Sequence, residues 1–227
     1  ISQNRFIASV SHELRTPLAV ILANASACEK APVKEQKTFF QVIAREGAQM
    51  STMLEQLLTL SRADSHGLAL RIEATDLQTL LLETYENFLP LATDSGHHLT
   101  IRLPETEIPL CECDSFRIRQ VCHILLHNAL SYTPCGCSIS LFLADGSYDK
   151  EISIGVQDNG PGIPTAEQDK IFERFYRGRS EQKGHHGLGL AVAKEIAAAH
   201  KGSLKVTNAE GGGALFILTL PLRYNPS

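Results

Sequence analysis

The chain has 227 residues, of which 43% are hydrophobic, and its formal net charge at pH 7 is -4. This length and apolar content suffice for one large domain or two small ones with a sizeable core. The small negative charge excludes a general attraction to nucleic acid or anionic lipid, because either would need a concentrated excess of Lys and Arg. No apolar run reaches the roughly 18 residues that a membrane-spanning helix needs.

The first part of the chain is predicted to form an antiparallel helical hairpin over residues 1–67. Apolar residues recur at intervals of three and four from Phe6 to Cys28, the pattern of an amphipathic helix. Pro32 interrupts the pattern, and a second stripe follows from Ile43 toward Gly67. Because two such helices bury little alone, we expect the hairpin to dimerise into a four-helix bundle.

The hydrophobic pattern changes after Gly67, and residues 68–227 are predicted to form an α/β sandwich. The predicted fold class of the whole chain is therefore α+β. Asp76 favours an N-cap for the helix "LQTLLLETYENFL", and further helices are predicted over 115–132 and 188–200. Between them lie five segments with the two-residue alternation of strands: "HLTIRL", "SISLFL", "EISIGV", "SLKVTN" and "ALFILTL". The two parts are expected to join near residues 64–73.

Six cysteines include two Cys-x-Cys pairs, a pattern that allows two interpretations. A thiolate metal site is one, but neither pair has the spacing of a zinc knuckle. Along a strand the two thiols of such a pair lie on one face, and reduced structural cysteines are the expectation for a cytosolic protein. The cysteines are Cys28, Cys111, Cys113, Cys122, Cys135 and Cys137.

The stretch "SHELRTPL" places His12 on the outer face of the first predicted helix. At 100° per residue, His12 lies about 180° from the apolar stripe. Glu13 flanks His12, so the carboxylate could hold Nδ1–H and present Nε2 as a nucleophile toward a phosphoryl group. Thr16 shares the face of His12, and Pro17 removes a helix hydrogen bond nearby. The alternatives are a surface histidine without function and a zinc-protease H-E-x-x-H motif, whose second ligand position holds Thr16.

Two glycine-containing stretches form a second candidate site. "EISIGV" leads into "QDNGPGIP", where Asp158 stands at a strand end with Gly160 and Gly162 behind it; a simple tight turn is the alternative. "HGLGLAVAKEIAAAH" places Gly187 and Gly189 at a helix start, where free N–H groups favour phosphate, although close packing would also explain these glycines. The chain has no G-x-x-x-x-G-K-[ST] loop.

The ordered set "SHELRTP", "RQVCHILLHNALSYTP", "DNGPGIP", "IFERFYRG" and "HGLGLAVAKEIAAAHKG" resembles the H, N, G1, F and G2 boxes of the sensor histidine kinases of two-component signalling. The resemblance covers essentially the whole chain. It implies a dimerisation and histidine-phosphotransfer hairpin, followed by a catalytic ATP-binding domain of the type shared with Hsp90, gyrase B and MutL.

The resemblance also implies roles for individual residues. His12 is similar to the phosphoacceptor, Glu13 to its base or orienting acid, and Thr16 to the residue that aims water in the phosphatase reaction. Asn128 matches the magnesium ligand and Asp158 the carboxylate that accepts the adenine amino group. The other implied ATP-binding residues lie beneath the base, in a mobile lid and over the triphosphate: Tyr132, Gly160, Gly162, Phe172, Phe175, Tyr176, Arg177, Gly187, Leu188 and Gly189.

Several positions depart from the family's pattern. Ile124 stands where an Asn is frequent, and Ser131 where a Lys or Arg is frequent, so His127 is a candidate replacement for the missing cation. His185 and His186 occupy positions where Gly and Thr or Ser are common, and they could touch phosphate or respond to pH. These changes put nucleotide affinity in question more than the fold.

The implied activity is ATP-dependent phosphorylation of His12 and transfer to an aspartate of a response regulator, with ATP and Mg²⁺ as cofactors and a homodimer as the working unit. A phosphatase activity toward that regulator is the expected companion. The chain begins at Ile1, which leads us to expect a cytoplasmic fragment whose membrane contact runs through a missing upstream sensor. The alternative is a degenerate transmitter that binds nucleotide poorly and acts as a dimeric scaffold.

Overall fold

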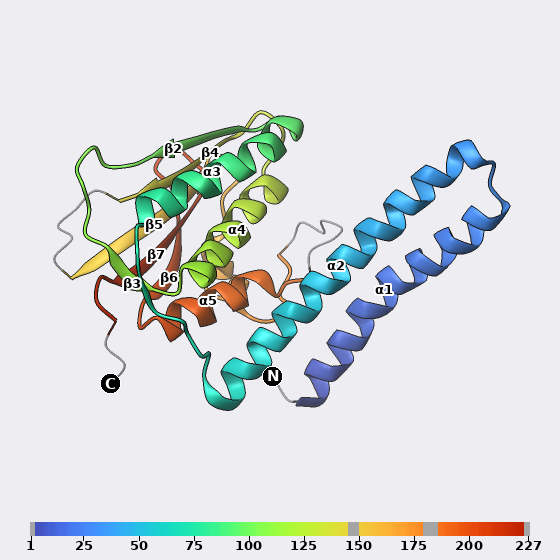
Figure 1. Cartoon of the computed structure of the whole chain (residues 1–227), viewed down its shortest axis with the longest axis horizontal. Coiled ribbons are helices and arrows are strands. Elements are labelled where there is room, and N and C mark those ends of the chain that lie inside the picture. The colour runs from blue at the N-terminus through green and yellow to red at the C-terminus, as the bar shows by residue number, and fades with distance from the viewer. Residues whose placement is uncertain (1–2, 145–149, 179–185, 225–227) are drawn as a thin grey trace.

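The computed structural model describes residues 3–144, 150–178 and 186–224, and its first element is a long helical hairpin (Figure 1). Helix α1 (Gln3–Lys30) and helix α2 (Val33–His66) lie side by side, with the turn at Pro32. Helix α1 continues through Pro17 without interruption. The predicted hairpin is confirmed, whereas the domain boundary between residues 67 and 68 stays a prediction.

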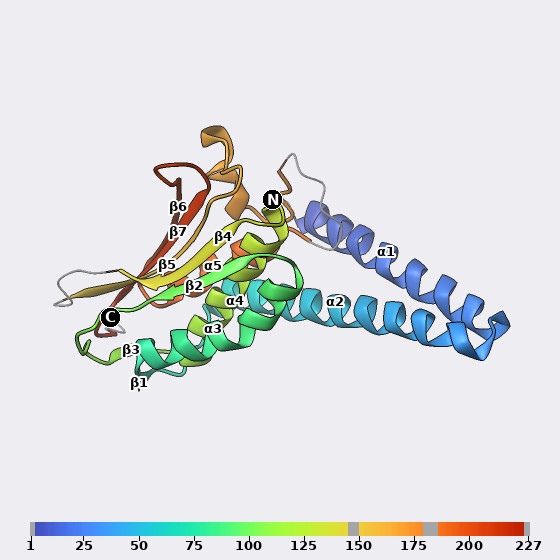
Figure 2. The ribbon, with the colours of Figure 1, turned by 90° about the horizontal axis from the view of Figure 1, so that it is seen from above.

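The rest of the chain forms a mixed five-stranded sheet with helices on one face, which confirms the predicted sandwich (Figures 1 and 2). The strand order is β2-β4-β5-β7-β6; β2 and β4 run parallel and the other neighbours antiparallel. The sheet strands are β2 (His98–Arg102), β4 (Ser138–Leu143), β5 (Glu151–Asp158), β6 (Ser203–Asn208) and β7 (Ala214–Pro221). The covering helices are α3 (Leu77–Asp94), α4 (Ser115–Tyr132) and α5 (Gly189–Ala199), and two 3-10 turns, η1 (Thr165–Glu167) and η2 (Lys170–Phe172), follow β5.

A second, two-stranded sheet was not predicted. It pairs β1 (Glu73–Thr75) with β3 (Cys111–Cys113), and three-residue strands are too short to show the alternation that reveals a strand in sequence. Cys111 and Cys113 are both buried, whereas Cys135 lies in the turn before β4 rather than on a strand.

Four of the six cysteines are buried. All six are free, and burial raises the pKa of Cys122 to about 12, which keeps this thiol protonated. Among the described residues no group of three or more metal-ligating side chains occurs. The same part of the chain contains no helix that is long and apolar enough to cross a bilayer.

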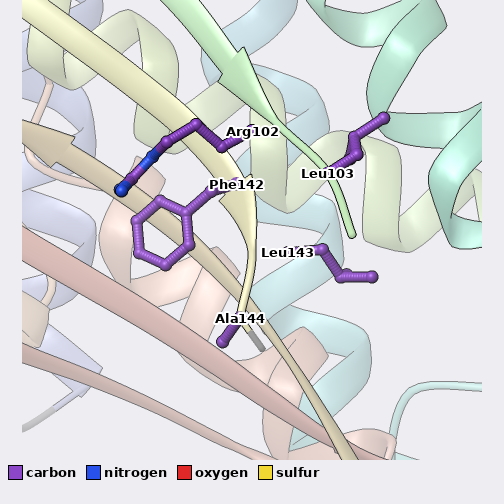
Figure 3. Close-up of a pocket in the computed structure, with 5 residues that line it drawn as sticks. All are labelled: Arg102, Leu103, Phe142, Leu143 and Ala144. Atoms are coloured by element: carbon purple, nitrogen blue, oxygen red, sulfur yellow. The ribbon is translucent and has the colours of Figure 1, made fainter. Parts of the chain in front are cut away.

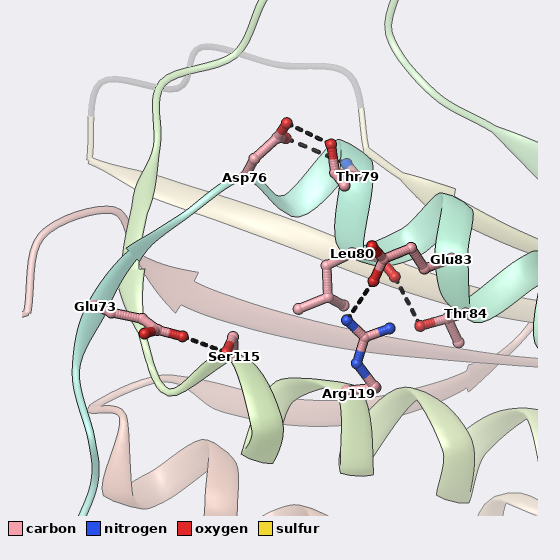
Figure 4. Close-up of polar contacts among 8 residues, drawn as sticks. All are labelled: Glu73, Asp76, Thr79, Leu80, Glu83, Thr84, Ser115 and Arg119. Atoms are coloured by element: carbon pink, nitrogen blue, oxygen red, sulfur yellow. Dashed lines mark hydrogen bonds and ion pairs between the residues drawn. The ribbon is translucent and has the colours of Figure 1, made fainter.

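Polar contacts hold helix α3 to helix α4 (Figure 4). The Asp76 carboxylate accepts hydrogen bonds from the backbone N–H and the hydroxyl of Thr79, which confirms the predicted N-cap of α3. One turn further on, Arg119 of α4 donates to Glu83 of α3 at 2.6 Å. The cap therefore defines where α3 begins, and the ion pair links the two helices across their exposed edge.

Helix α2 extends the core of the sandwich into the hairpin. Met53, Leu57 and Leu60 are buried in the same apolar cluster as α4 and α5, and Val10 and Leu14 of α1 pack against that cluster. Full burial of such a side chain stabilises by about 1.5–3 kcal/mol. The lower half of the hairpin is thus packed on the helix layer, with α2 beside α5 (Figure 1). This packing brings α1, and with it His12, to the sandwich.

A buried histidine joins α5 to the start of α4. His200 Nε2 accepts the backbone N–H of Asp114 at 3.0 Å, and its Nδ1–H donates to the Ile196 carbonyl at 2.8 Å. The Asp114 side chain caps α4 by accepting from Arg117 N–H, and it also accepts from Arg71 N–H in the segment that follows α2. Because an acceptor Nε2 carries no proton, this arrangement requires neutral His200.

We predict that acid destabilises the fold through His200. Burial lowers the pKa of His200 below its ordinary value of about 6.5, so the unfolded chain binds a proton that the folded chain does not. The stability held by neutral His200 is present above about pH 6.5 and is lost as the pH falls through the folded-state pKa. In urea unfolding, His200→Gln should lose less free energy of unfolding than the parent chain between pH 7.5 and 5.5. The substitution His98→Gln, at an exposed position, is the matched control. The prediction would be contradicted if the free energy of unfolding fell by the same amount in His200→Gln as in the parent chain over this pH range.

Candidate functional site

His12 and Thr16 lie exposed on α1, one helical turn apart, as predicted. Glu13 beside them is half-buried, since it faces the sandwich rather than solvent. Pro17 has no N–H, so the Glu13 carbonyl lacks the usual helical donor at this point. Among the described residues no hydrogen bond joins Glu13 to His12. The expected pairing of these two side chains is therefore not present in this conformation.

The Glu13 carboxylate instead binds two side chains from the far end of the sequence. Arg177 Nη2 lies 2.6 Å from Glu13 Oε2, and His186 Nδ1 lies 3.1 Å from the same oxygen. Arg177 was predicted to lie in the lid, whereas the contact of His186 with Glu13 was not predicted. Sequence separations of 164 and 173 residues explain why no local pattern could reveal these contacts. The acid next to His12 is thus the point where the two halves of the chain meet.

A second ion pair links the segment that carries Arg177 to the hairpin. The Arg174 guanidinium donates to both Asp64 carboxylate oxygens of α2, at 2.6 and 2.7 Å. These hydrogen bonds hold the pKa of Asp64 below its ordinary value. Such fork-shaped pairs fix orientation as well as distance. The segment from Arg174 to Arg177 is therefore attached to α2 at one end and to α1 at the other.

Asp158 stands at the end of β5 with its side chain buried at 7% exposure. Its Oδ1 accepts backbone N–H groups from Gly160 at 2.9 Å and from Ala214 at 3.1 Å. Neither bond uses Oδ2, which leaves this oxygen to accept from a ligand donor such as an exocyclic amine. The simple-turn interpretation of "DNGPG" does not account for a carboxylate held in this way.

The backbone around Asp158 approaches so closely that only glycine fits. A Cβ at Gly213 would lie 1.9 Å from the Asp158 carbonyl oxygen, and a Cβ at Gly160 would lie 2.6 Å from Thr133 Cγ2. Gly162 has φ +71°, a conformation that favours glycine, and a Cβ there would lie 2.9 Å from Asn208 Oδ1. Sequence reasoning missed Gly213 and Thr133; the run "GGG" at 211–213 was the available signal for the first.

Gly187 joins two backbone segments at the start of α5. It has φ +66°, its carbonyl accepts the Phe175 N–H at 2.8 Å, and a Cβ there would lie 2.6 Å from the Tyr176 carbonyl oxygen. Phe175 itself has φ +63°, a left-handed conformation that is unusual outside glycine. Leu188 is fully buried and anchors the segment. The predicted lid and the predicted phosphate loop are thus directly bonded.

Helix α4 presents Asn128 and Tyr132 on the side of the site. Asn128 is half-buried, and no hydrogen bond among the described residues occupies its carboxamide, so its oxygen can serve as a metal ligand. Partial burial raises the pKa of Tyr132, and the nearby charge of Arg177 acts in the opposite direction. Tyr132 therefore lies near Arg177, and Asn128 lies one helical turn earlier on α4.

Structural observations bear on two of the positions discussed with the departures from the family's sequence pattern, Ile124 and His127. Ile124 packs toward Gly189 at the start of α5, where a Cβ on the glycine would lie 3.2 Å from Ile124 Cγ2. Partial burial lowers the pKa of His127, which favours its neutral form and argues against His127 as the replacement cation for Ser131. His185 lies outside the described residues, as do Arg179 and Lys183.

Aromatic packing attaches residues 171–178, called here the F-box segment, to the sheet. The Phe172 ring contacts Phe216 of β7 edge-on with centroids 6.5 Å apart, and Lys194 Nζ lies 5.2 Å above the same ring. Phe175 is also packed against the core. Tyr176, between Phe175 and Arg177, is half-buried. In this conformation the segment is packed down rather than extended into solvent.

Two shallow hollows lie on the opposite, uncovered face of the sheet. One is lined by Arg102, Leu103, Phe142, Leu143 and Ala144, with the Arg102 side chain beside the Phe142 ring (Figure 3). The other is lined by Arg102, Ser138, Ser140, Gln157, Asp158 and Asn159. Asp158 lines the second hollow, whereas neither Glu13 nor Asn128 lines either one. The two hollows therefore do not contain the contact between Glu13 and Arg177.

Comparison with known proteins matches both halves of the chain to described families. Residues 2–66 match the "His Kinase A (phospho-acceptor) domain", and residues 113–224 match the "Histidine kinase-, DNA gyrase B-, and HSP90-like ATPase" family. The sensor histidine kinase RppB of Synechocystis is 36% identical over 97% of this chain, and WalK of Bacillus subtilis is 32% identical over 97%. The chain spans only 49% and 37% of the lengths of these two relatives.

Solved structures agree with these matches. The histidine kinase AdeS of Acinetobacter baumannii superposes with a TM-score of 0.75 at 25% identity and covers 93% of this chain and 98% of its own. The histidine kinase ThkA, solved in complex with the response regulator TrrA, gives a TM-score of 0.77 at 24% identity over 98% of this chain and 63% of its own. The hairpin and the sandwich are thus found together, in this order, in solved histidine kinases.

We predict that Asp64 holds the F-box segment against the hairpin. Replacement Asp64→Arg places two cations together, so backbone amides of residues 171–178 should exchange hydrogen faster, and the exchanged pair Asp64→Arg with Arg174→Asp should restore slow exchange. Glu83→Arg breaks the ion pair with Arg119 far from this segment and is the matched control. Unchanged exchange in Asp64→Arg would show that the pair does not hold the segment.

Proposed function

Because this chain belongs to the sensor histidine kinases of two-component signalling, we propose that it uses ATP to phosphorylate His12 and passes the phosphoryl group to an aspartate of a response regulator. The single observation that carries the proposal is the contact of Arg177 with Glu13. The contact supports the proposal because Arg177 belongs to the ATP-binding domain and binds the residue next to His12 in sequence, and transferring phosphoryl oxygens need compensation of charge.

The adenine end of ATP is assigned to Asp158. A carboxylate with Oδ1 held by two backbone donors keeps a fixed orientation, and Oδ2 then accepts from the exocyclic amine of the base. Gly160 and Gly213 keep this region free of side-chain atoms, which fits a flat ring. Asn128 would hold Mg²⁺ through its carboxamide oxygen, and the ion would neutralise phosphate charge.

The transfer itself needs positioned groups more than covalent chemistry by the protein. His12 Nε2 attacks the terminal phosphorus, an N–P bond forms, and the bond to the bridging oxygen breaks with its electron pair leaving on ADP. Glu13 accepts the proton from His12 Nδ1. Because Arg177 binds Glu13 Oε2 in this conformation, Arg177 must release this oxygen before Glu13 can serve as the base.

The hairpin supports the proposed homodimer and the proposed regulator contact. Apolar side chains lie exposed along both helices, among them Leu22 at 60% exposure, and a second hairpin would cover them as in a four-helix bundle. The large exposed apolar side chains of the two helices are Leu18, Leu22, Val33, Phe40, Leu54 and Leu58. His12 and Thr16 remain accessible to a regulator, and Thr16 is assigned to aiming water in the phosphatase reaction.

We predict that His12 carries the phosphoryl group. With γ-labelled ATP and Mg²⁺, the parent chain should acquire label that is labile to acid and stable to alkali, and His12→Gln should acquire none while its calorimetric affinity for ATP changes less than about twofold. Thr16→Gln on the same helix face is the matched control and should still be labelled. Label persisting on His12→Gln would remove His12 from its role. Dimerisation without label or ATP binding in the parent chain would favour the scaffold.

We predict that Asp158→Asn loses nucleotide binding. The Asn side chain keeps the size of Asp158 but presents an N–H₂ group that repels the adenine amine, so affinity for ATP and ADP should fall at least about a hundredfold, the scale of an unpaired buried polar group. Asn159→Asp alters the adjacent residue in the opposite chemical sense and serves as the control. Calorimetric affinity unchanged by Asp158→Asn would contradict the adenine assignment.

A further inference from the structure

A backbone hydrogen bond at the neighbouring residue Gly187 positions His186. The Phe175 N–H donates to the carbonyl of Gly187, and the Gly187 backbone leaves no room for a Cβ against Phe175 and Tyr176. This bond joins the segment that carries Arg177 to the segment that carries His186. Both side chains consequently reach the same oxygen of Glu13.

Among the described residues, one ring nitrogen of His186 has a hydrogen-bond partner and the other has none. Its side chain is 13% exposed, and Nδ1 lies 3.1 Å from Glu13 Oε2, so Nδ1 must carry the proton that this contact shares. Nε2 is fully buried and has no hydrogen-bond partner among the described residues. A buried polar atom without a partner is costly, and it indicates a group that is supplied from outside the chain.

The surroundings of His186 favour an anion at Nε2. Its charged neighbours in the described contacts are Glu13 of α1 and Arg177 of the F-box segment, and Tyr132 of α4 lies near Arg177. Among the described residues, the other histidine with an unpartnered buried Nε2 is His123, where the Phe88 ring and positive Arg119 are the neighbours instead. Of these two histidines, only His186 combines the orphan nitrogen with a carboxylate on its opposite nitrogen.

We infer that His186 binds the terminal phosphoryl group of ATP: Nδ1–H stays with Glu13, and Nε2 takes a proton from solvent and donates it in a hydrogen bond to a phosphoryl oxygen. The inference rests on the proposed function and adds a residue to it. His186 thereby supplies the cation that is absent at Ser131, which His127 does not replace. No covalent bond forms or breaks at His186.

This assignment has a consequence for nucleotide selectivity. A group that contacts only the terminal phosphoryl contributes to binding of a triphosphate and not to binding of a diphosphate. The charged hydrogen bond therefore gives the protein a preference for ATP over ADP, and its loss should be visible as a change in the ratio of the two affinities. A purely structural role of His186 would change both affinities together.

The test is calorimetric titration of the 227-residue chain with AMPPNP and with ADP, both with Mg²⁺. His186→Gln keeps a neutral donor near Glu13 but cannot take a charge, so affinity for AMPPNP should fall about tenfold, the size of a charged hydrogen bond, while affinity for ADP changes less than about twofold. His186→Lys restores a cation and should recover most of the preference. His98→Gln, on an exposed part of β2, is the matched control.

Proton linkage gives a second readout. Titrations repeated in buffers of different ionisation enthalpy report the protons taken up with AMPPNP, and the parent chain should take up more than His186→Gln. Equal losses for AMPPNP and ADP, no loss for either, or identical proton uptake in both proteins would overturn the assignment of His186 while leaving the proposed function in place. Absence of binding by either nucleotide to the parent chain would overturn both.

Discussion

The packing of α2 against α5 is the contact on which the rest of the arrangement depends. Met53, Leu57 and Leu60 belong to the core of the sandwich as well as to the hairpin, so the two halves share one apolar cluster. Without this burial the exposed ion pairs between the halves would be too weak to align them, because solvent-exposed pairs contribute little. With it, α1 is held where Glu13 meets residues of the ATP-binding domain.

Glu13 is under two demands that compete. As a counter-ion it binds Arg177 and His186, and as the proposed base it would accept a proton from His12. A carboxylate shared by two donors is a poor base, since hydrogen bonds to the charged form stabilise that form. In the proposed reaction, anionic phosphate offers Arg177 an alternative acceptor, while His186 would meet it through Nε2. Arrival of the substrate would thus be coupled, through one carboxylate oxygen, to release of Glu13 by Arg177.

Close backbone approach organises the nucleotide end of the site. At Asp158 the strand, the turn and the segment before β7 come together with no space for side chains at Gly160 and Gly213. At Gly187 the F-box segment and the α5 start are joined in the same way. The two ends of the proposed ATP site are therefore shaped by backbone geometry, and the chemistry is left to a few side chains on this frame.

The sequence by itself determined the hairpin, the five long strands, the three covering helices and the motif residues, because hydrophobic periodicity, caps and glycine positions are local signals. It missed the three-residue strands β1 and β3, which are too short to show a period. Only the tertiary structure decided that Glu13 faces Arg177 and His186 rather than His12, and that Ile124 packs toward Gly189. These contacts join residues far apart in the chain, and their partners follow from how the hairpin packs on the helix layer.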